Sequence, residues 1–167
     1  MEWLRRLFGA VSEDEMEGLR LRGSSWELSK VVPDVSSFLR ALPKLVPDDA
    51  ILFLEGGAHP AFLRVLLDER RFYPALRPAL GTIWPRQPTF ALPTTPAFLA
   101  ELARAVESCA VGEVCSHLHV YREKEILLEG YDAFTRPFSI SGAVPERQVR
   151  DFCADLGVSW THTRGPV

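Results

Sequence analysis

Two histidines and an aspartate that lie close together in the chain are its first candidates for chemistry. His117 and His119 are separated by one residue, and Asp132 follows a short way downstream. Side chains two residues apart in a β-strand point to the same face, so both imidazoles could reach one metal ion with the carboxylate as a third ligand. The same groups could act as a general acid and base. Glu55 and His59 could join such a catalytic or metal site.

A hairpin with two structural histidines explains the same residues without any catalysis. A His-x-His pair recurs by chance, and the chain has no further ligand motif with the spacing of a zinc site. Each imidazole would then be half-buried beside Tyr121 and Leu128 and would hold a hydrogen bond. We favour this interpretation, assign no metal and no cofactor, and keep His117, His119 and Asp132 as the second hypothesis.

A second position where ligands collect is the junction between a strand and a helix at residues 52–63, LFLEGGAHPAFL. A buried strand would end at Glu55, a turn would follow at Gly56 and Gly57, and a helix would begin near His59. The unpaired amides at the start of a helix attract anions. The segment lacks the Lys-Ser or Lys-Thr pair of a P-loop and the GxGxxG of a dinucleotide site. A tight connection is therefore the simpler role for these glycines.

Arginines and aromatic residues are interleaved in a third candidate segment, residues 70–86, RRFYPALRPALGTIWPR. It contains four arginines and no acidic residue. Arginine and large aromatic side chains dominate protein interfaces because they provide area and planar hydrogen bonding at a small entropy cost. The same mixture of residues would also suit binding of single-stranded nucleic acid, whose bases stack on aromatic rings and whose phosphates pair with arginine. The structural alternative is a loop whose aromatic residues, such as Trp84, are buried as anchors while the arginines stay solvated. Among partners we favour a protein, and the candidate binding residues are Arg70, Arg71, Tyr73, Arg77, Trp84 and Arg86.

Four helices are indicated by apolar spacing together with a boundary signal. We expect them in residues 33–42, 59–71, 94–110 and 144–157. Asp34 is typical of an N-cap, Thr95 before a proline of a helix start, and Gly157 of a helix end. In the second helix, Phe62 and the leucines that follow it are expected to face inward.

Strands fill the intervals between these helices. We expect them in residues 24–32, 50–55, 88–93 and 138–142, and in the two arms of a hairpin within residues 115–134. A polar cluster, residues 122–125, marks the turn of the hairpin. Pairing Arg122 with Glu125 would place His119 opposite Leu128, and both histidines would share a face with Asp132. A single bulge would break this set.

Composition places the chain among ordinary globular proteins. It has 167 residues, of which 47% are hydrophobic and 25% are charged, enough to bury a core without disulfides or structural metals. The order of elements predicts an α+β fold with a mixed or antiparallel sheet of about five or six strands and about four packed helices. We expect residues 1–167 to form a single domain, with a possible peripheral helix in residues 1–18.

Charge and cysteine content narrow the partners and the compartment. The formal net charge of −3 argues against a general phosphate-binding surface, so we do not expect nucleic acid as a partner. Three cysteines leave one unpaired in any disulfide scheme, and no CxxC pair occurs. This pattern favours reduced thiols in the cytoplasm. The chain contains no run of about 18 apolar residues, so we expect no membrane span.

These observations predict a soluble, cytoplasmic, non-enzymatic domain that binds another protein, for which an adaptor-type or immunity-type role would suit the size and mild acidity. The alternative is a small metal-dependent hydrolase, or another enzyme, that uses His117, His119 and Asp132. An enzyme needs these polar groups to converge in a concavity, whereas a binding domain does not.

Overall fold

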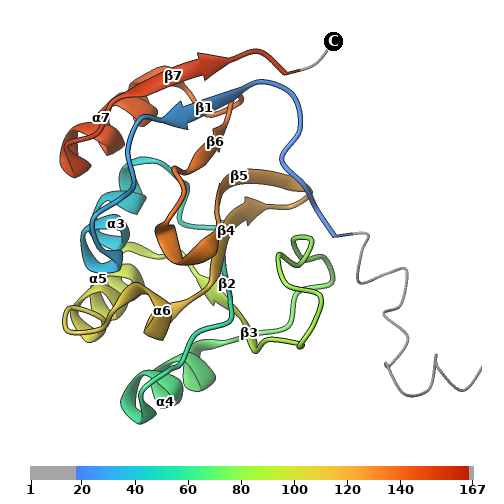
Figure 1. Ribbon diagram of the computed structural model, residues 1–167, viewed down its shortest axis with the longest axis vertical. Coiled ribbons are helices and arrows are strands. Elements are labelled where there is room, and N and C mark those ends of the chain that lie inside the picture. The colour runs from blue at the N-terminus through green and yellow to red at the C-terminus, as the bar shows by residue number, and fades with distance from the viewer. Residues whose placement is uncertain (1–17, 166–167) are drawn as a thin grey trace, which may run out of the picture.

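A seven-stranded antiparallel sheet forms the centre of the computed structural model, which describes residues 18–165 (Figure 1). Its strand order is β3-β2-β4-β5-β6-β1-β7. The strands are β1 Ser25–Leu28, β2 Ile51–Glu55, β3 Thr89–Pro93, β4 His117–Arg122, β5 Glu125–Gly130, β6 Ser139–Ser141 and β7 Trp160–Thr163. The predicted α+β class is confirmed, and the sheet has more strands than expected because β7 was not predicted. The helix predicted in residues 1–18 lies outside the described residues, apart from Gly18.

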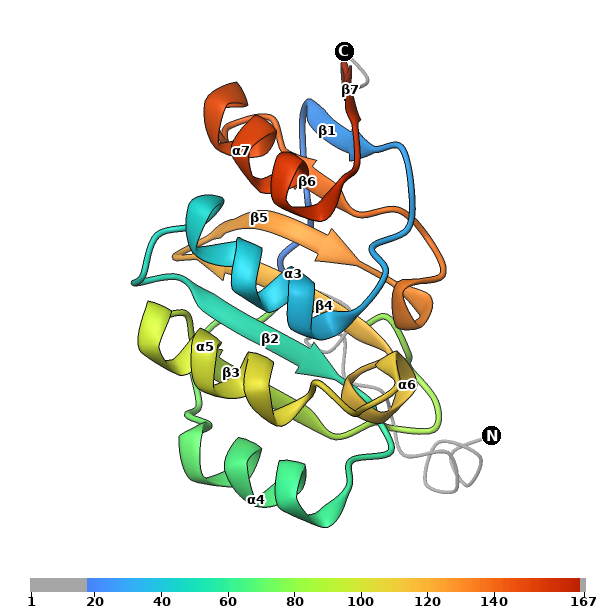
Figure 2. The same cartoon turned by 90° about the vertical axis from the view of Figure 1, so that its left-hand side faces the viewer.

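Helices cover one face of the sheet, and an irregular segment crosses the other (Figures 1 and 2). Within residues 18–165 the helices are α3 Val35–Ala41, α4 Ala61–Arg70, α5 Pro96–Ala105, α6 Val111–Val114 and α7 Glu146–Leu156, with the 3₁₀ turns η1 Leu42–Lys44 and η2 Asp132–Phe134. No helix in this described part has both the length and the apolar character that crossing a membrane requires. The irregular segment, residues 71–88, connects α4 to β3 and is called the 71–88 loop below.

The helix ends follow local sequence signals. Asp34 Oδ1 accepts a hydrogen bond from the Ser37 amide at 2.7 Å, and the Thr95 hydroxyl accepts one from the Phe98 amide at 3.4 Å. Gly157 ends α7 with a φ of 65°, in the left-handed region where a residue without Cβ is not strained. The three predicted helix boundaries are therefore confirmed.

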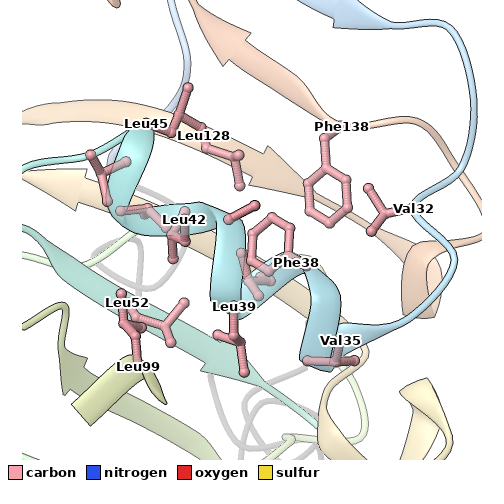
Figure 3. Packing of buried hydrophobic residues seen from close by; sticks show 14 of the residues in the cluster. Val32, Val35, Phe38, Leu39, Leu42, Leu45, Leu52, Leu99, Leu128 and Phe138 are labelled. Atoms are coloured by element: carbon pink, nitrogen blue, oxygen red, sulfur yellow. The ribbon is translucent and has the colours of Figure 1, made fainter. Parts of the chain in front are cut away.

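The main core lies between the helices and the sheet (Figure 3). Phe38 of α3 is fully buried at its centre. Its ring stacks on that of Phe138, with centroids 4.9 Å apart, and meets the ring of Phe152 edge-on at 5.9 Å. Leu52 and Leu128 close the core from the sheet. Burial of a side chain as large as phenylalanine stabilises the fold by about 2–3 kcal/mol.

Helix α4 buries a narrower stripe than its sequence suggested. Leu63 and Leu67, one helical turn apart, are fully buried, whereas Phe62 and Val65 are 54% and 56% exposed. The prediction that Phe62 faces inward was therefore wrong. The main contact of α4 with the sheet is to β3, the edge strand, and Leu66 is only partly buried against the core.

Candidate functional site

The two candidate histidines lie on the face of the sheet that the 71–88 loop covers, which we call the loop face. In β4 they alternate with Leu118 and Val120, whose side chains belong to the core beneath the helices. His117 and His119 are 6% and 1% exposed. They therefore share a buried face, as the period of a strand requires.

Glu55 ends β2 on the same face, directly opposite His117 in the register. Its carboxylate is fully buried and accepts two backbone hydrogen bonds from the loop, from Gly81 N and Thr82 N, at 2.7 Å each. A buried ionised group is tolerated only where hydrogen bonds compensate its lost hydration. Both carboxylate oxygens are thus used to hold the loop against the sheet.

His117 holds the same part of the loop through its side chain. The Asp132 amide donates to Nδ1 of its ring at 3.2 Å, so Nδ1 carries no proton. The proton of the neutral ring is then on Nε2, which donates to the Thr82 hydroxyl at 2.9 Å. Gly81 passes so close to this ring that a Cβ there would lie 2.5 Å from its Cδ2 atom. Only glycine fits at this crossing.

His119 belongs to a separate chain of polar groups. Its Nε2 atom lies 3.2 Å from the Tyr131 hydroxyl, which donates to the Glu129 carboxylate at 3.3 Å. Burial, together with the neighbouring His117, lowers the pKa of His119 to about 4, so the ring is neutral near pH 7. Burial also raises the pKa of Tyr131 to about 12 and raises the pKa of Glu129. Within the described residues, Nδ1 of His119 is buried without a hydrogen-bond partner.

A bulge in the β4–β5 hairpin explains why sequence reasoning missed part of this chain. Val120 pairs with Leu128 and Tyr121 pairs with Ile126, so Leu127 has no partner in β4 and is an extra residue in β5. The bulge turns Leu128 toward the core beneath the helices and places Glu129 opposite His119. The predicted pairing of His119 with Leu128 was therefore wrong. Once the extra residue is counted, the alternation of β5 brings Glu129 and then Tyr131 to the loop face, but no pattern in the sequence marks the bulge.

The prediction that Asp132 shares a strand face with the two histidines was wrong, because β5 ends at Gly130 and Asp132 approaches the histidines through its backbone alone. It begins η2, where its amide bonds His117, while its carboxylate pairs with Arg136 at 2.8 Å. The side chains of Asp132 and Arg136 are both substantially exposed. Among residues 18–165, no group of three or more His, Cys, Asp or Glu side chains is arranged to hold a metal ion. The metal-dependent alternative therefore gains no support from the geometry.

His59 contacts a different part of the molecule. Its Nε2 atom lies 2.9 Å from the Val114 carbonyl oxygen, to which it donates, and its ring meets Phe90 edge-on at 5.2 Å. Burial lowers the pKa of His59. Gly56 and Gly57 form the preceding turn with φ values of 75° and 111°, which confirms their expected role in a tight connection. His59 thus ties the start of α4 to α6.

The 71–88 loop exposes large apolar side chains to solvent. Tyr73 is 81% exposed and Trp84 is 70% exposed. The expectation that Trp84 is a buried anchor was therefore wrong. Leu76 and Ile83, at 43% and 52% exposed, lie on the same loop and were missed because aliphatic residues in a sequence usually indicate core.

The arginines of the candidate segment divide between two surfaces. Arg70 pairs with Glu101 of α5 at 3.2 Å and so belongs to the helix layer. Arg71 pairs with Asp68 at 3.3 Å and lies over the Tyr73 ring, 5.4 Å from its centroid. Arg77 and Arg86 lie further along the loop, where Arg86 is exposed and Arg77 is partly buried.

Backbone contacts fix this loop at several points although it has little regular structure. The Phe72 amide donates to the Ala91 carbonyl of edge strand β3 at 3.0 Å. The Tyr121 hydroxyl donates to the Leu76 carbonyl at 2.8 Å. The pair of bonds to Glu55 adds a third point of attachment. The loop is therefore held in place while its largest side chains face water.

No protein-family model, curated protein or solved structure matches this chain.

Proposed function

We propose that the protein is a non-catalytic domain that binds another protein through the exposed surface of the 71–88 loop. The observation that carries the proposal is the combination of large exposed apolar side chains with a fixed backbone. Tyr73, Leu76, Ile83 and Trp84 are all more than two-fifths exposed. Several large apolar side chains exposed on one short loop are more typical of a protein interface than of a surface that contacts only water.

The anchored backbone favours binding for an energetic reason. A flexible loop loses conformational entropy when a partner orders it, and this loss weakens the complex. Here the hydrogen bonds to Glu55 and Phe72 have already ordered the loop in the unbound protein. Rigid aromatic side chains on a fixed scaffold are typical of the residues that contribute most to protein interfaces.

The hydrogen bonds of the polar side chains on the loop face also support a non-catalytic role. A catalytic acid or base must reach the proton of a substrate. The side-chain polar atoms of Glu55 and His117 are instead hydrogen-bonded to the loop and to the Asp132 amide. Their buried positions are accounted for by the attachment of the loop.

The proposal is tested by a pair of matched double variants in a capture experiment from cells that express the chain. In the first, Tyr73→Ser and Trp84→Ser remove the exposed aromatic residues of the loop. In the control, Phe62→Ser and Val65→Ser remove exposed apolar residues of α4. All four are exposed, so each variant should retain the fold within about 0.5 kcal/mol, as circular dichroism and urea unfolding would verify.

We expect a partner to be cross-linked to the parent protein and to the α4 control, and to be lost from the loop variant. Cross-linked peptides should map to residues 71–88. Retention of the partner by the loop variant, or equal loss from both variants, would contradict binding through the loop.

A further inference from the structure

The first described residues of the chain attach directly to the 71–88 loop. The Leu19 amide donates to the Arg77 carbonyl, and the Ala79 amide donates to the Leu19 carbonyl, at 2.9 Å each. Gly18 passes so close to this crossing that a Cβ there would lie 2.2 Å from the Ala79 nitrogen. The blue start of the described chain accordingly lies beside the green loop (Figure 1). Residues 1–17 are therefore joined to the fold at the middle of the loop.

Exposed apolar side chains lie on both sides of this crossing along the loop. Tyr73 and Leu76 come at most four residues before it, and Ile83 and Trp84 come at most five residues after it. All four are at least 43% exposed, and we call them the loop side chains. Five residues of fully extended chain span at most about 18 Å, so the backbone of each of the four lies within this distance of the crossing.

The sequence of residues 1–17, MEWLRRLFGAVSEDEME, has two parts of opposite character. Trp3, Leu4, Leu7 and Phe8 are spaced so that they would share one side of a helix, and we call them the apolar motif. Residues 12–17 contain four acidic residues, a composition typical of a solvated linker. The sequence therefore supplies an apolar motif on a polar tether.

The tether has the length that the loop side chains require. Ten residues lead from Phe8 to Gly18, and a flexible chain of that length spans ~17 Å on average. A ligand on such a tether has an effective concentration on the order of a millimolar. An intrinsic dissociation constant of ~0.1 mM, weak for a free peptide, would then keep about nine-tenths of the molecules closed.

We propose that residues 1–17 are an internal ligand of the 71–88 loop, and that the apolar motif closes reversibly over the loop side chains. The exposed loop side chains represent the open form of this equilibrium. Closure removes apolar surface of both the motif and the loop from water, which is the driving force for the contact.

The regulatory consequence of closure rests on the proposed function. A partner that binds the loop side chains competes with the apolar motif, so residues 1–17 weaken partner binding until they are displaced. The contact between the motif and the loop does not itself depend on any partner. It can therefore be measured on the purified chain alone.

Methyl NMR of the isoleucines in the full chain measures closure directly. Ile83 is 52% exposed and is one of the loop side chains, whereas Ile126 and Ile140 are 3% and 0% exposed and serve as internal references for the fold. The observable is the relaxation that a soluble paramagnetic agent causes at each methyl group, because this relaxation rises as the group becomes accessible to solvent.

Two double variants within residues 1–17 are compared with the parent. Trp3→Ser with Phe8→Ser weakens the apolar motif, and Val11→Ser with Met16→Ser removes two apolar side chains from the rest of the segment. We expect the first variant to relax the Ile83 methyl at least about twofold faster than the parent, and the second to match the parent, because only the first opens the loop. The parent value should be the same at ~20 µM and ~400 µM protein, since an intramolecular contact does not depend on concentration.

A photo-cross-link tests the position of the motif independently. The photoreactive analogue p-benzoylphenylalanine in place of Phe8 keeps an aromatic ring in the motif. We expect it to cross-link to residues 71–88 of the same chain. Phe62 and Val65 of α4 are the competing target, because they are also large, apolar and exposed.

Three results would overturn the inference. The first is unchanged Ile83 relaxation in the Trp3→Ser and Phe8→Ser variant, and the second is cross-linking to α4 in place of the loop. The third is protection of Ile83 that disappears on dilution, because the occupant would then be a second copy of the chain.

These results are separable from the capture experiment. Failure of closure would leave the loop available to a partner, and retention of the partner by the Tyr73→Ser and Trp84→Ser variant would not alter the relaxation of Ile83. If both proposals hold, the Trp3→Ser and Phe8→Ser variant should bind the captured partner about three- to tenfold more tightly than the parent, because more of its molecules are open.

Discussion

Replacement of the buried His119 imidazole should make the protein more resistant to acid. The physical reason is the difference between its two protonation states in the fold. Burial lowers the pKa of His119 to about 4, from the ordinary histidine value of 6.5 that applies when the chain is unfolded. Between these two values the unfolded chain binds a proton that the folded chain does not. The free energy of unfolding therefore falls as the pH falls through this window.

The size of the effect follows from the two pKa values. One pH unit inside the window corresponds to about 1.4 kcal/mol of differential proton binding. Between pH 7.5 and pH 4.5, His119 alone should therefore remove ~2–3 kcal/mol from the free energy of unfolding. Domains of ordinary size are stable by about 5–15 kcal/mol, so a loss of this size is readily measured.

The assay is urea unfolding, followed by tryptophan fluorescence, of the parent and of His119→Gln at the two pH values. Glutamine can place a polar atom near the position of Nε2 and keep the bond to the Tyr131 hydroxyl, but it does not titrate. Burial raises the pKa of Glu129, which acts in the opposite direction, because the folded chain then takes up a proton before the unfolded chain. Glu129 is present in both proteins, so its contribution cancels when the two pH-dependent losses are subtracted.

His162→Gln supplies a matched control, because this imidazole lies on the exposed edge strand β7. We expect the His119→Gln protein to lose ~2–3 kcal/mol less stability than the parent between the two pH values, and the His162→Gln protein to behave as the parent does. An equal loss in the parent and in His119→Gln would refute the reasoning. It would mean that the fold does not hold this ring in its neutral form.

Urea unfolding and limited proteolysis would check three further substitutions. Glu55→Gln replaces one carboxylate oxygen with a donor that faces the loop amides, so it should cost ~2 kcal/mol and make the bonds near Gly81 and Thr82 easier to cleave; unchanged cleavage would contradict the anchoring role. Gly81→Ala should destabilise by ~1–3 kcal/mol because its Cβ would overlap the His117 ring. Gly112→Ala in α6 meets no atom within 4 Å and should stabilise by up to ~1 kcal/mol; a loss there would show that α6 does not tolerate the added methyl group.

Local signals in the sequence were sufficient for the helix boundaries and for the hairpin turn. An N-cap such as Asp34, or a glycine such as Gly157, acts within one turn of the chain and needs no knowledge of the rest of the fold. The pair of Arg122 with Glu125 was predictable for the same reason, because the polar residues of the turn set the register next to it.

The predicted register of the hairpin was wrong where the sequence does not indicate to which face of the sheet each side chain points. Ile126, Leu127 and Leu128 are consecutive apolar residues, and here both faces of β5 meet apolar neighbours. An extra residue in such a run does not disturb the alternation of polar and apolar positions, so the bulge is invisible in the sequence. The bulge changed the candidate site, because it placed Glu129 on the loop face where the predicted register has an apolar residue.

The sheet order was not predictable because it depends on pairs that are remote in the chain. Strand β1 lies between β6 and β7, and Trp26 pairs with Ile140 on one side and with His162 on the other. Strand β7 itself has a mixed polar sequence and follows the last helix closely. Its assignment requires the exposed edge of β1, which only the complete fold provides.

The buried polar residues and the exposed loop are two parts of one arrangement. An irregular loop laid across a sheet brings backbone amides into a region that water does not reach, and each of these amides needs an acceptor. Glu55 supplies two acceptor atoms there, and His117 binds the adjoining hydroxyl. Residue types that look catalytic in the sequence can thus serve to hold a loop without regular structure against a sheet. That attachment fixes the backbone that carries the exposed Tyr73 and Trp84 side chains. In the proposed function it links the polar residues to binding without requiring them to contact a partner.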